Sequence, residues 1–307
     1  MGWTISDILY NVGLPLSVVY ILYALLSPRR RKMSLQDKVV LITGASSGLG
    51  RACAHAFYAA GCKVILSARN VDALDKVKQD IMNSTEAGKA IQKYTPKVLK
   101  LDLSDIAHIP KFARQALNFY DRVDILVNNA GISYRGEAQS TTTDVDLQLL
   151  TVNYLGQVAL TKALLPSMRQ QGEGSIVAVS SVQGRIAIPY RSAYAASKHA
   201  TQAFFDSLRA EVASKNINVL VVSPGYIKTN LSLNAVTADG TSYGAMDATT
   251  ANGMEPEYVA KRIIDGTSRG LEEITLCPMM HKLAIILRAI LPTVYFSIMR
   301  KRAEKGQ

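Results

Sequence analysis

Cysteine and histidine are scarce in this chain of 307 residues. There are three cysteines, Cys53, Cys62 and Cys277, and four histidines. No two cysteines have the spacing of a zinc site, and the cysteines do not suggest a disulfide framework. The histidines do not cluster. The sequence therefore indicates neither a metal centre nor a disulfide-rich secreted fold.

Acidic residues are outnumbered, because 35 Lys and Arg stand against 24 Asp and Glu, a net charge of +11. Much of this excess lies beside apolar segments: Arg29, Arg30, Arg31 and Lys32 contribute +4, and residues 300–305 contribute +3. Subtracting these seven charges leaves +4 for the remainder. Basic clusters beside apolar runs favour an anionic membrane surface as partner. No nucleic-acid partner is expected.

Long apolar runs are also few, and the most continuous one is residues 8–26. At about 1.5 Å per residue a helix of this length spans about 28 Å, close to a hydrocarbon core of about 30 Å. Four basic residues follow the run, whereas a secretory signal carries its charges before it. We therefore expect residues 1–33 to hold a retained transmembrane anchor, with a cleaved signal as the alternative. The positive-inside rule predicts that residue 29 and everything after it face the cytosol.

Residues 34–280 alternate between short apolar runs and helical patterns. The expected strands are 38–43, 63–67, 98–101, 123–127, 175–179, 217–222 and 273–276. The expected helices are one opening after Gly50 and those at 72–85, 105–119, 145–168, 193–214 and 256–270. This alternation predicts an α/β fold, a single Rossmann-type doubly wound parallel sheet covered by helices on both faces.

Two segments depart from the alternation. Residues 231–253 show no periodicity, and we interpret them as a mobile flap over a substrate, with disorder as the alternative. Residues 281–307 form an apolar tail with a basic end, interrupted by Arg288 and Pro292. This tail predicts a helix, a break and a second helix, lying on a membrane or capping a pocket.

A glycine-rich segment, Thr43 to Gly50, follows the first expected strand and opens a helix. Glycines let the backbone approach a pyrophosphate, whose charge a helix N-terminus favours. The second expected strand leads into Arg69 and Asn70, where an acidic residue would instead select NAD. Arg69 can pair with a 2′-phosphate, which favours NADP(H), with a solvent-facing arginine as the alternative.

A tyrosine and a lysine, Tyr194 and Lys198, lie four residues apart, so a helix would present them on one face. A tyrosine ordinarily titrates near pH ~10, and a neighbouring ammonium lowers that pKa towards useful proton transfer. The hydroxyl of Ser181 could hold the oxygen that exchanges the proton. A chance pair on an ordinary helix is the alternative. The position of every motif at or just after a strand's carboxyl end argues against it.

Together TGASSGLG at 43–50, NNAG at 128–131, YAASK at 194–198 and PG at 224–225 resemble the short-chain dehydrogenase/reductase family, over about residues 36–277. The resemblance implies a seven-stranded sheet and hydride transfer with NAD(P)(H). It implies that Tyr194 is the general acid/base, and that Lys198 lowers its pKa and holds the nicotinamide ribose. Ser181 would position the substrate oxygen, and Asn153 would hold a water that links Lys198 to solvent.

The same resemblance, together with the Arg69 argument, gives a cofactor-binding set in which Asp102 contacts the adenine. Its members are Thr43, Gly44, Ser46, Ser47, Gly48, Leu49, Gly50, Arg69, Asn70, Asp102, Leu103, Asn129, Ala130, Gly131, Tyr194, Lys198, Pro224, Gly225, Ile227 and Thr229. The family also implies a homodimer through helices around 145–170 and 193–214.

A narrower resemblance, to a membrane-anchored branch of the family, is carried by 128–136, 192–211 and 223–232. It implies a single-pass protein of the endoplasmic reticulum membrane, with the peroxisomal membrane as a second location. It also implies a lipid-like carbonyl substrate, acyl-dihydroxyacetone phosphate in ether-lipid synthesis, with a steroid or retinoid as the alternative. A catalytically silent, membrane-tethered binding protein is the alternative of another class. The complete Ser181, Tyr194, Lys198 and Asn153 set argues against it.

Candidate substrate residues are Arg135, Gln183, Arg191 and Tyr226. A phosphorylated substrate needs cations beside the catalytic tyrosine. The doubly wound sheet predicts that Arg135, Arg185, Arg191 and Lys228 lie near one rim, where two of them could pair with a phosphate. Ordinary surface cations are the alternative.

Overall fold

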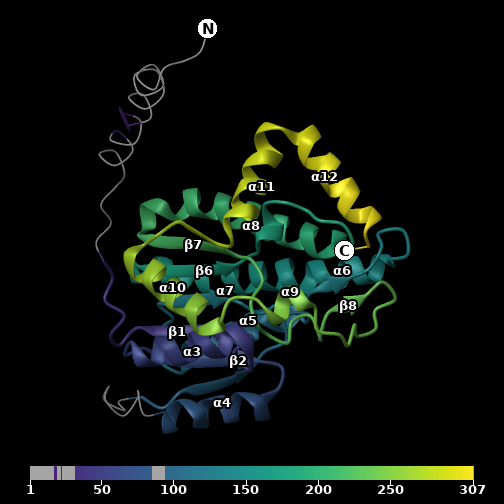
Figure 1. The fold of residues 1–307 in the computed structure, drawn as a ribbon. Coiled ribbons are helices and arrows are strands. Elements are labelled where there is room, and N and C mark those ends of the chain that lie inside the picture. Colours follow the sequence, from purple (N-terminus) through teal and green to yellow (C-terminus); the bar gives the residue numbers. More distant parts are fainter. Residues whose placement is uncertain (1–16, 19–21, 23–31, 85–93, 307) are drawn as a thin grey trace. The chain divides into compact units, whose positions relative to one another are not determined.

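Seven parallel strands form one sheet in the order β3-β2-β1-β4-β6-β7-β9 (Figure 1). The computed structural model describes residues 17–18, 22, 32–84 and 94–306. The strands are β1 (Val39–Thr43), β2 (Lys63–Ala68), β3 (Lys97–Lys100), β4 (Ile125–Asn128), β6 (Gly174–Val179), β7 (Ile217–Pro224) and β9 (Glu273–Leu276). Each expected strand is confirmed to within three residues at either end.

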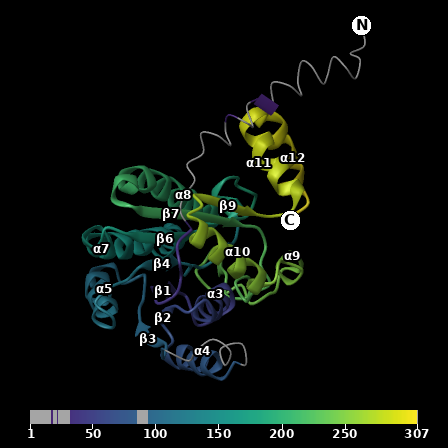
Figure 2. The same ribbon diagram turned by 90° about the vertical axis from the view of Figure 1, so that its left-hand side faces the viewer.

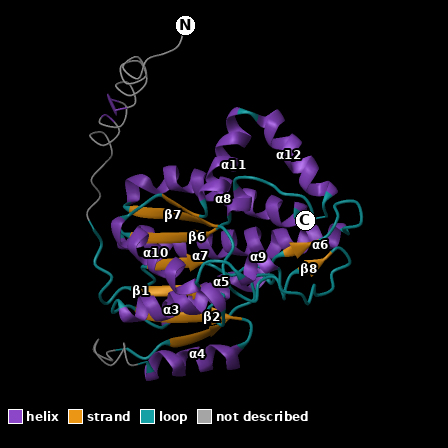
Figure 3. Cartoon of the chain, viewed as in Figure 1, coloured by secondary structure: helices purple, strands orange, loops and turns teal. Residues whose placement is uncertain are grey.

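Helices cover both faces of this sheet (Figure 3). Side chains of β1 alternate between two cores, Val40 and Ile42 in one and Val39 and Leu41 in the other. The first core is completed by α3 (Gly48–Ala59), α4 (Val71–Asn83) and α10 (Pro256–Arg269). The second is completed by α5 (Ile109–Asn118), α7 (Gly156–Gln171) and α8 (Ser192–Val212). Burial on both faces explains the continuous apolar runs and confirms the Rossmann-type fold.

The strand order reverses between β1 and β4, since β2 and β3 lie on one side of β1 and β6, β7 and β9 lie beyond β4. At such a switch point the segments that follow the carboxyl ends diverge and leave a crevice. The fold therefore puts the Gly-rich segment after β1 opposite the residues that follow β4 and β6.

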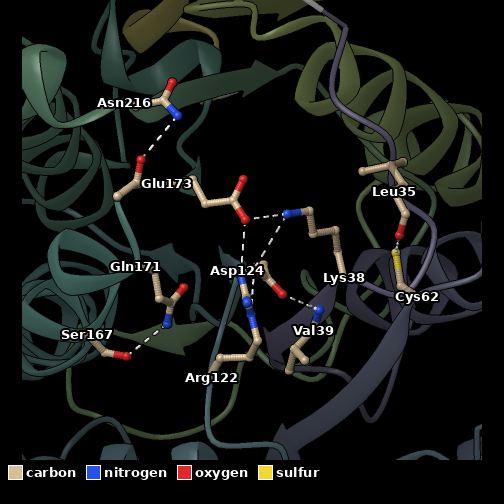
Figure 4. A network of polar contacts seen from close by, with 11 residues as sticks. Leu35, Lys38, Val39, Cys62, Arg122, Asp124, Ser167, Gln171, Glu173 and Asn216 are labelled. Carbon is tan, nitrogen blue, oxygen red and sulfur yellow. Dashed lines mark hydrogen bonds and ion pairs between the residues drawn. The ribbon is translucent and has the colours of Figure 1, made fainter.

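A polar network connects the amino ends of the central strands, at the end of the sheet opposite the crevice (Figure 4). Buried Asp124 accepts a hydrogen bond from Val39 N (2.8 Å) and forms an ion pair with Arg122. Glu173 accepts from Lys38 (2.6 Å) and Arg122 (3.0 Å), and these cations hold the pKa of Glu173 below its usual value. The starts of β1, β4 and β6 are therefore fixed relative to one another, far from the crevice.

The helical stretch expected at 145–168 is longer and less regular than the sequence indicated. It consists of α6 (Thr143–Leu150), a π-turn (Thr151–Leu155) and α7. Such π-turns recur at functional sites, and this one carries Asn153, which is fully buried. A π-turn holds one residue more per turn than an α-helix, and the regular apolar spacing of α6 and α7 on either side gives no sign of it in the sequence.

The apolar tail forms two helices, as expected, α11 (Met279–Ile290) and α12 (Pro292–Glu304). The break falls at Leu291, directly before Pro292, and Arg288 lies inside α11. Residues 231–253 contain β8 (Val236–Thr237), which pairs with β5 (Tyr134–Arg135), and a short helix, α9 (Ala248–Ala251). Elements this short leave no periodic signal, which explains why the sequence did not reveal them.

Among the residues that the structure describes, no helix is both long and apolar enough to cross a membrane. The expected anchor at 8–26 falls almost entirely outside them. The anchor stays a prediction.

Candidate active site

The turn between β1 and α3 forms a narrow cradle of backbone. Gly44 and Gly48 have φ of +66° and +50°, in the left-handed region that glycine adopts at low cost. A Cβ on Gly50 would lie 2.1 Å from Gly44 O, so the helix and the turn approach too closely for any side chain. Thr43 Oγ1 accepts hydrogen bonds from Asn129 N and Ala130 N, both 3.0 Å, which joins the cradle to the end of β4.

The strand ends beside this cradle carry the residues expected at the adenosine end. Asn70 Oδ1 accepts from Ala73 N (3.0 Å) and caps α4. Asp102 Oδ1 accepts from the backbone N (2.9 Å) and hydroxyl (2.7 Å) of Ser104, which fixes the turn after β3. Both residues and Arg69 line the same cavity as the cradle.

The first turns of α8 present Tyr194 and Lys198 on the face that the four-residue spacing predicted. Lys198 Nζ lies 5.8 Å from the Tyr194 ring centroid and donates a hydrogen bond to Val179 O (2.9 Å). Ser181 follows β6, and its Oγ accepts from Gln183 N (3.1 Å). All three side chains are almost fully buried and line one cavity.

Burial dominates the proton affinities of this group. It raises the pKa of Tyr194, while a hydrogen bond with Ser181 and the charge of Arg135 act in the opposite direction. Burial lowers the pKa of Lys198 to about 8. In this structure the opposing influences on the Tyr194 pKa therefore come from Ser181 and Arg135 rather than from Lys198, whose ammonium is directed at Val179 O.

Asn153 in the π-turn lies behind the catalytic candidates rather than in the cavity lining. Its Nδ2 donates to Ile132 O (2.9 Å) and Ser197 Oγ (3.0 Å), and its Oδ1 accepts from Ile132 N (2.8 Å). Asn153 thereby links α8 to the segment after β4. The water-holding role stays a prediction.

The glycine cradle, the strand ends beside it, and Ser181, Tyr194 and Lys198 border one continuous cavity of about 1120 Å³. Its volume exceeds the ~300–1,000 Å³ of an ordinary ligand pocket, so it has room for more than one ligand. Every residue of the predicted cofactor-binding set lines it, and so do Arg135, Gln183 and Tyr226. The structure thus brings the predicted residues together, and their individual roles stay predictions.

The four cations expected at one rim are not equivalent. Arg185 pairs with Glu273 and Lys228 with Glu255 (3.0 Å), and neither lines the cavity. Both positions lie near the rim, but local carboxylates already neutralise them. Of the four cations expected near one rim, Arg185 and Lys228 are therefore not the two that could pair with a phosphate in this cavity.

Arg135 and Arg191 instead share one carboxylate, Asp247. Arg135 Nε donates to Asp247 Oδ2 (2.9 Å), and Arg191 Nη2 lies 3.9 Å from the same oxygen. Burial and the charge of Arg135 lower the pKa of Arg191 to about 10. Arg135 lines the cavity, whereas Arg191 does not. The trio carries an excess of one positive charge, and the charge of Arg135 acts on Tyr194.

Sequence reasoning missed two components of this site. Asp247 lies in the aperiodic segment, 112 positions from Arg135, and no local pattern marks it. The individual side chains that α11 and α12 place on the cavity, such as Leu283 and Leu287, were not named either. The sequence indicated only that the tail as a whole could cap a pocket, without indicating which of its side chains do so.

The buried ammonium of Lys198 should make stability depend on pH. Between about pH 8 and 10.5 the unfolded chain still holds the lysine proton that the folded protein has released. The free energy of unfolding of the wild type, relative to Lys198→Met, should therefore rise with pH through this window. Denaturant unfolding of both proteins across this range measures the slope. The same substitution at exposed Lys261 is the matched control, and equal slopes for the two variants would contradict the buried charge.

Comparison with known proteins identifies the class. The family model described as short chain dehydrogenase matches residues 38–239. The chain belongs to the short-chain dehydrogenase family and is an oxidoreductase of that family.

Several relatives are similar over nearly the whole chain. It is 52% identical over 303 residues to the dehydrogenase/reductase SDR family protein 7-like of Drosophila melanogaster, covering 99% of this chain and 91% of that protein. It is 51% identical to dehydrogenase/reductase SDR family member 7B of Xenopus tropicalis, covering 94% of this chain and 92% of that protein. The narrower resemblance seen in the sequence is thereby confirmed as a similarity.

Solved structures of the family share the fold. A short-chain dehydrogenase from Streptomyces avermitilis superposes with a TM-score of 0.69 at 31% identity, covering 88% of this chain and 99% of that one. An alcohol dehydrogenase from the archaeon Thermococcus sibiricus, complexed with 5-hydroxy-NADP, gives 0.66 at 25% identity, covering 78% and 96%. The latter protein binds a nicotinamide dinucleotide.

Proposed function

We propose that this protein is an NADP(H)-dependent reductase of a carbonyl group on a lipid-like substrate. One observation carries the proposal: a single cavity runs from the glycine cradle, past Tyr194, to apolar side chains of α11 and α12. A polar nucleotide fits the first part, and an apolar substrate fits the last. The catalytic candidates lie between the two.

The residues present fit a nicotinamide dinucleotide, because the turn is so tight that only glycine fits at positions 44 and 50. Without side chains there, a pyrophosphate can approach the backbone of the turn. Bound NADPH would supply the hydride. Tyr194 gives the proton to the carbonyl oxygen, and Ser181, whose hydroxyl acts against the rise in the Tyr194 pKa, orients that oxygen. The charge of Arg135 and the Ser181 hydroxyl favour the phenolate that forms, whereas Lys198, held by Val179 O, is assigned to the nicotinamide ribose. Gln183 Oε1, buried and without a partner in the described chain, can accept a bond from the alcohol.

The experiment that tests the function is turnover. The purified full chain should oxidise NADPH when a long-chain ketone is supplied in mixed micelles. Parallel assays with acyl-dihydroxyacetone phosphate, a steroid ketone and a retinal rank the substrate classes. Absence of NADPH oxidation with all of them, with the cofactor still bound, would favour the catalytically silent binding protein.

Within this class we propose acyl-dihydroxyacetone phosphate as the particular substrate. Arg135 supports it, because this buried guanidinium lines the cavity and, with Arg191, exceeds the charge of Asp247 by one. Arg135 already donates four of its five N–H groups, to Asp247, Ser133 Oγ and Tyr134 O. A phosphate would pair with the remaining N–H and with the net positive charge. Higher catalytic efficiency with the steroid or the retinal than with the phosphorylated lipid would overturn this choice.

Selection of NADPH rests on Arg69 at the end of β2. Arg69→Asp should weaken NADPH binding by about tenfold or more, because a carboxylate repels the 2′-phosphate, with NADH binding unchanged or improved. Titration of intrinsic fluorescence with both cofactors measures this. The control is Lys100→Asp, which makes the same charge change at an exposed position on neighbouring β3. Equal wild-type efficiency with NADPH and NADH would contradict the role of Arg69.

We also propose that residues 8–26 anchor the protein in the endoplasmic reticulum membrane, with the peroxisomal membrane as a second location and the catalytic domain in the cytosol. The apolar length and the basic residues at 29–32 support this proposal. Protease added to sealed microsomes should digest the chain from residue 33 onward. Full protection until detergent is added would place the domain in the lumen.

A further inference from the structure

The hairpin formed by α11 and α12 exposes an apolar surface. Half of the exposed large apolar side chains in the described chain belong to it, including Met280 (73% exposed), Ile290 (69%) and Phe296 (49%). Figures 1 and 2 show this yellow hairpin standing away from the helices that cover the sheet. Contiguous apolar patches on a protein surface mark interaction sites.

The hairpin is nevertheless firmly attached along one side. Tyr295, 2% exposed, packs against Val182 and Ile186, and its hydroxyl donates to Ala187 O. Tyr190 Oη donates to Ala303 O (2.9 Å). The hairpin therefore has partners on the loop after Ser181, whereas Met279, Val294 and Phe296 stay exposed and do not line the cavity.

The exposed side chains also border the catalytic cavity. Met280, Leu283, Ile286, Ile290, Leu291 and Ile298 are each about half exposed or more and line the cavity at the same time. Because these side chains belong to both surfaces, the cavity opens through the hairpin. A ligand that enters here passes between apolar side chains.

The charge of the hairpin selects one kind of partner. Residues 279–306 contain six cations, Lys282, Arg288, Arg300, Lys301, Arg302 and Lys305, against the single acid Glu304, a net charge of +5. Arg288 lies 4.7 Å over the Phe296 ring, at the edge of the apolar surface. Apolar side chains together with several cations are the composition by which amphipathic helices bind anionic lipid.

We propose that α11 and α12 lie in the interface of an anionic membrane and that the cavity opens into its acyl-chain region. A lipid carbonyl compound then reaches Tyr194 from the bilayer without passing through water. This entry route rests on the proposed function, whereas the membrane contact of the hairpin does not.

Site-specific fluorescence on the full chain tests the contact. Cys53 and Cys62 are buried, and burial raises the pKa of each thiol to about 12, so replacing Cys277 by serine leaves no readily labelled cysteine. In this background Ile290→Cys carries an environment-sensitive dye. Tyr258→Cys on α10, 52% exposed, is the matched control at a position away from the hairpin.

With vesicles of phosphatidylcholine and phosphatidylserine, the dye at position 290 should shift to the blue. Lipids that carry a nitroxide on the acyl chain should quench it several-fold more than the dye at 258. The effect should weaken with salt, which screens the cations, and in phosphatidylcholine alone, which carries no net negative charge. Equal quenching at both positions would overturn the proposal. A blue shift that grows with protein concentration without lipid quenching would show that a second copy covers the hairpin instead.

A kinetic comparison tests the entry route separately. Val294 is 47% exposed near the start of α12 and does not line the cavity, and an aspartate there suits a helix N-terminus. Val294→Asp should raise KM several-fold for a ketone lipid held in vesicles, and leave KM for a water-soluble ketone unchanged. Equal effects on both substrates, or no effect on the lipid, would overturn the route. A wild-type protein that reduced none of the ketones would refute the proposed function. The quenching experiment would still decide whether the hairpin contacts the membrane.

Discussion

Replacing Tyr194 with phenylalanine should lower kcat for carbonyl reduction by about 10²–10⁴-fold, the usual contribution of a positioned general acid. Phenylalanine fills the same buried volume and removes only the hydroxyl that gives up the proton. The cofactor cradle at 43–50 is separate from that hydroxyl, so the Kd for NADPH should stay close to that of the wild type. Steady-state kinetics and a fluorescence titration with NADPH measure the two quantities.

Tyr134→Phe is the matched control, because Tyr134 is buried in the same apolar cluster as Tyr194, loses the same atom and does not line the cavity. Its kcat should stay within a few-fold of the wild type. A Tyr194→Phe enzyme that retained activity within a few-fold would remove Tyr194 from the mechanism. A variant that lost NADPH binding as well would show that the phenol supports the cofactor rather than the proton transfer.

Gly50→Ala should damage both folding and cofactor binding. The added Cβ would meet the Gly44 carbonyl oxygen at 2.1 Å and Asn129 Nδ2 at 2.6 Å. The first is backbone, and the second is held by its hydrogen bond to Thr43 O, so neither gives way easily. Forcing one methyl into so tight a contact costs about 1–3 kcal/mol of stability. Because α3 or the turn must shift, its backbone N–H groups no longer point at the same place. NADPH affinity should fall by about tenfold or more, equivalent to about 1.4 kcal/mol.

Gly172→Ala separates this effect from a general intolerance of alanine. Gly172 ends α7 at φ +69°, and a Cβ added there would meet no atom within 4 Å, so only the backbone conformation is penalised. That penalty is about 1–2 kcal/mol, and NADPH affinity should not change. Thermal unfolding and cofactor titration of both variants decide the matter. Wild-type affinity in Gly50→Ala would mean that the close approach of turn and helix is not needed for the cofactor.

Much of the fold was predictable because the signals are local. A strand buried on both faces must be apolar along nearly all of its length, as β1 is from Val39 to Ile42. A helix must repeat its apolar side every three or four residues. Parallel strands then bring their carboxyl ends to one edge, whatever the sequence distance between them. For this reason the sequence alone predicted that Gly44, Ser181 and Tyr194 would meet, and the structure places all three around one cavity.

Only the tertiary structure decided which charges pair and which surfaces stay uncovered. Arg135 and Arg191 looked like two free cations, yet both meet Asp247 across the aperiodic segment, and a contact between distant residues leaves no periodic trace. The tail at 279–304 reads the same whether its apolar side chains are buried or exposed. Docking through Tyr295 and partly buried neighbours such as Ile285 and Leu287 buries a narrow strip of the hairpin. The remaining apolar side chains stay exposed at and beside the mouth of the cavity.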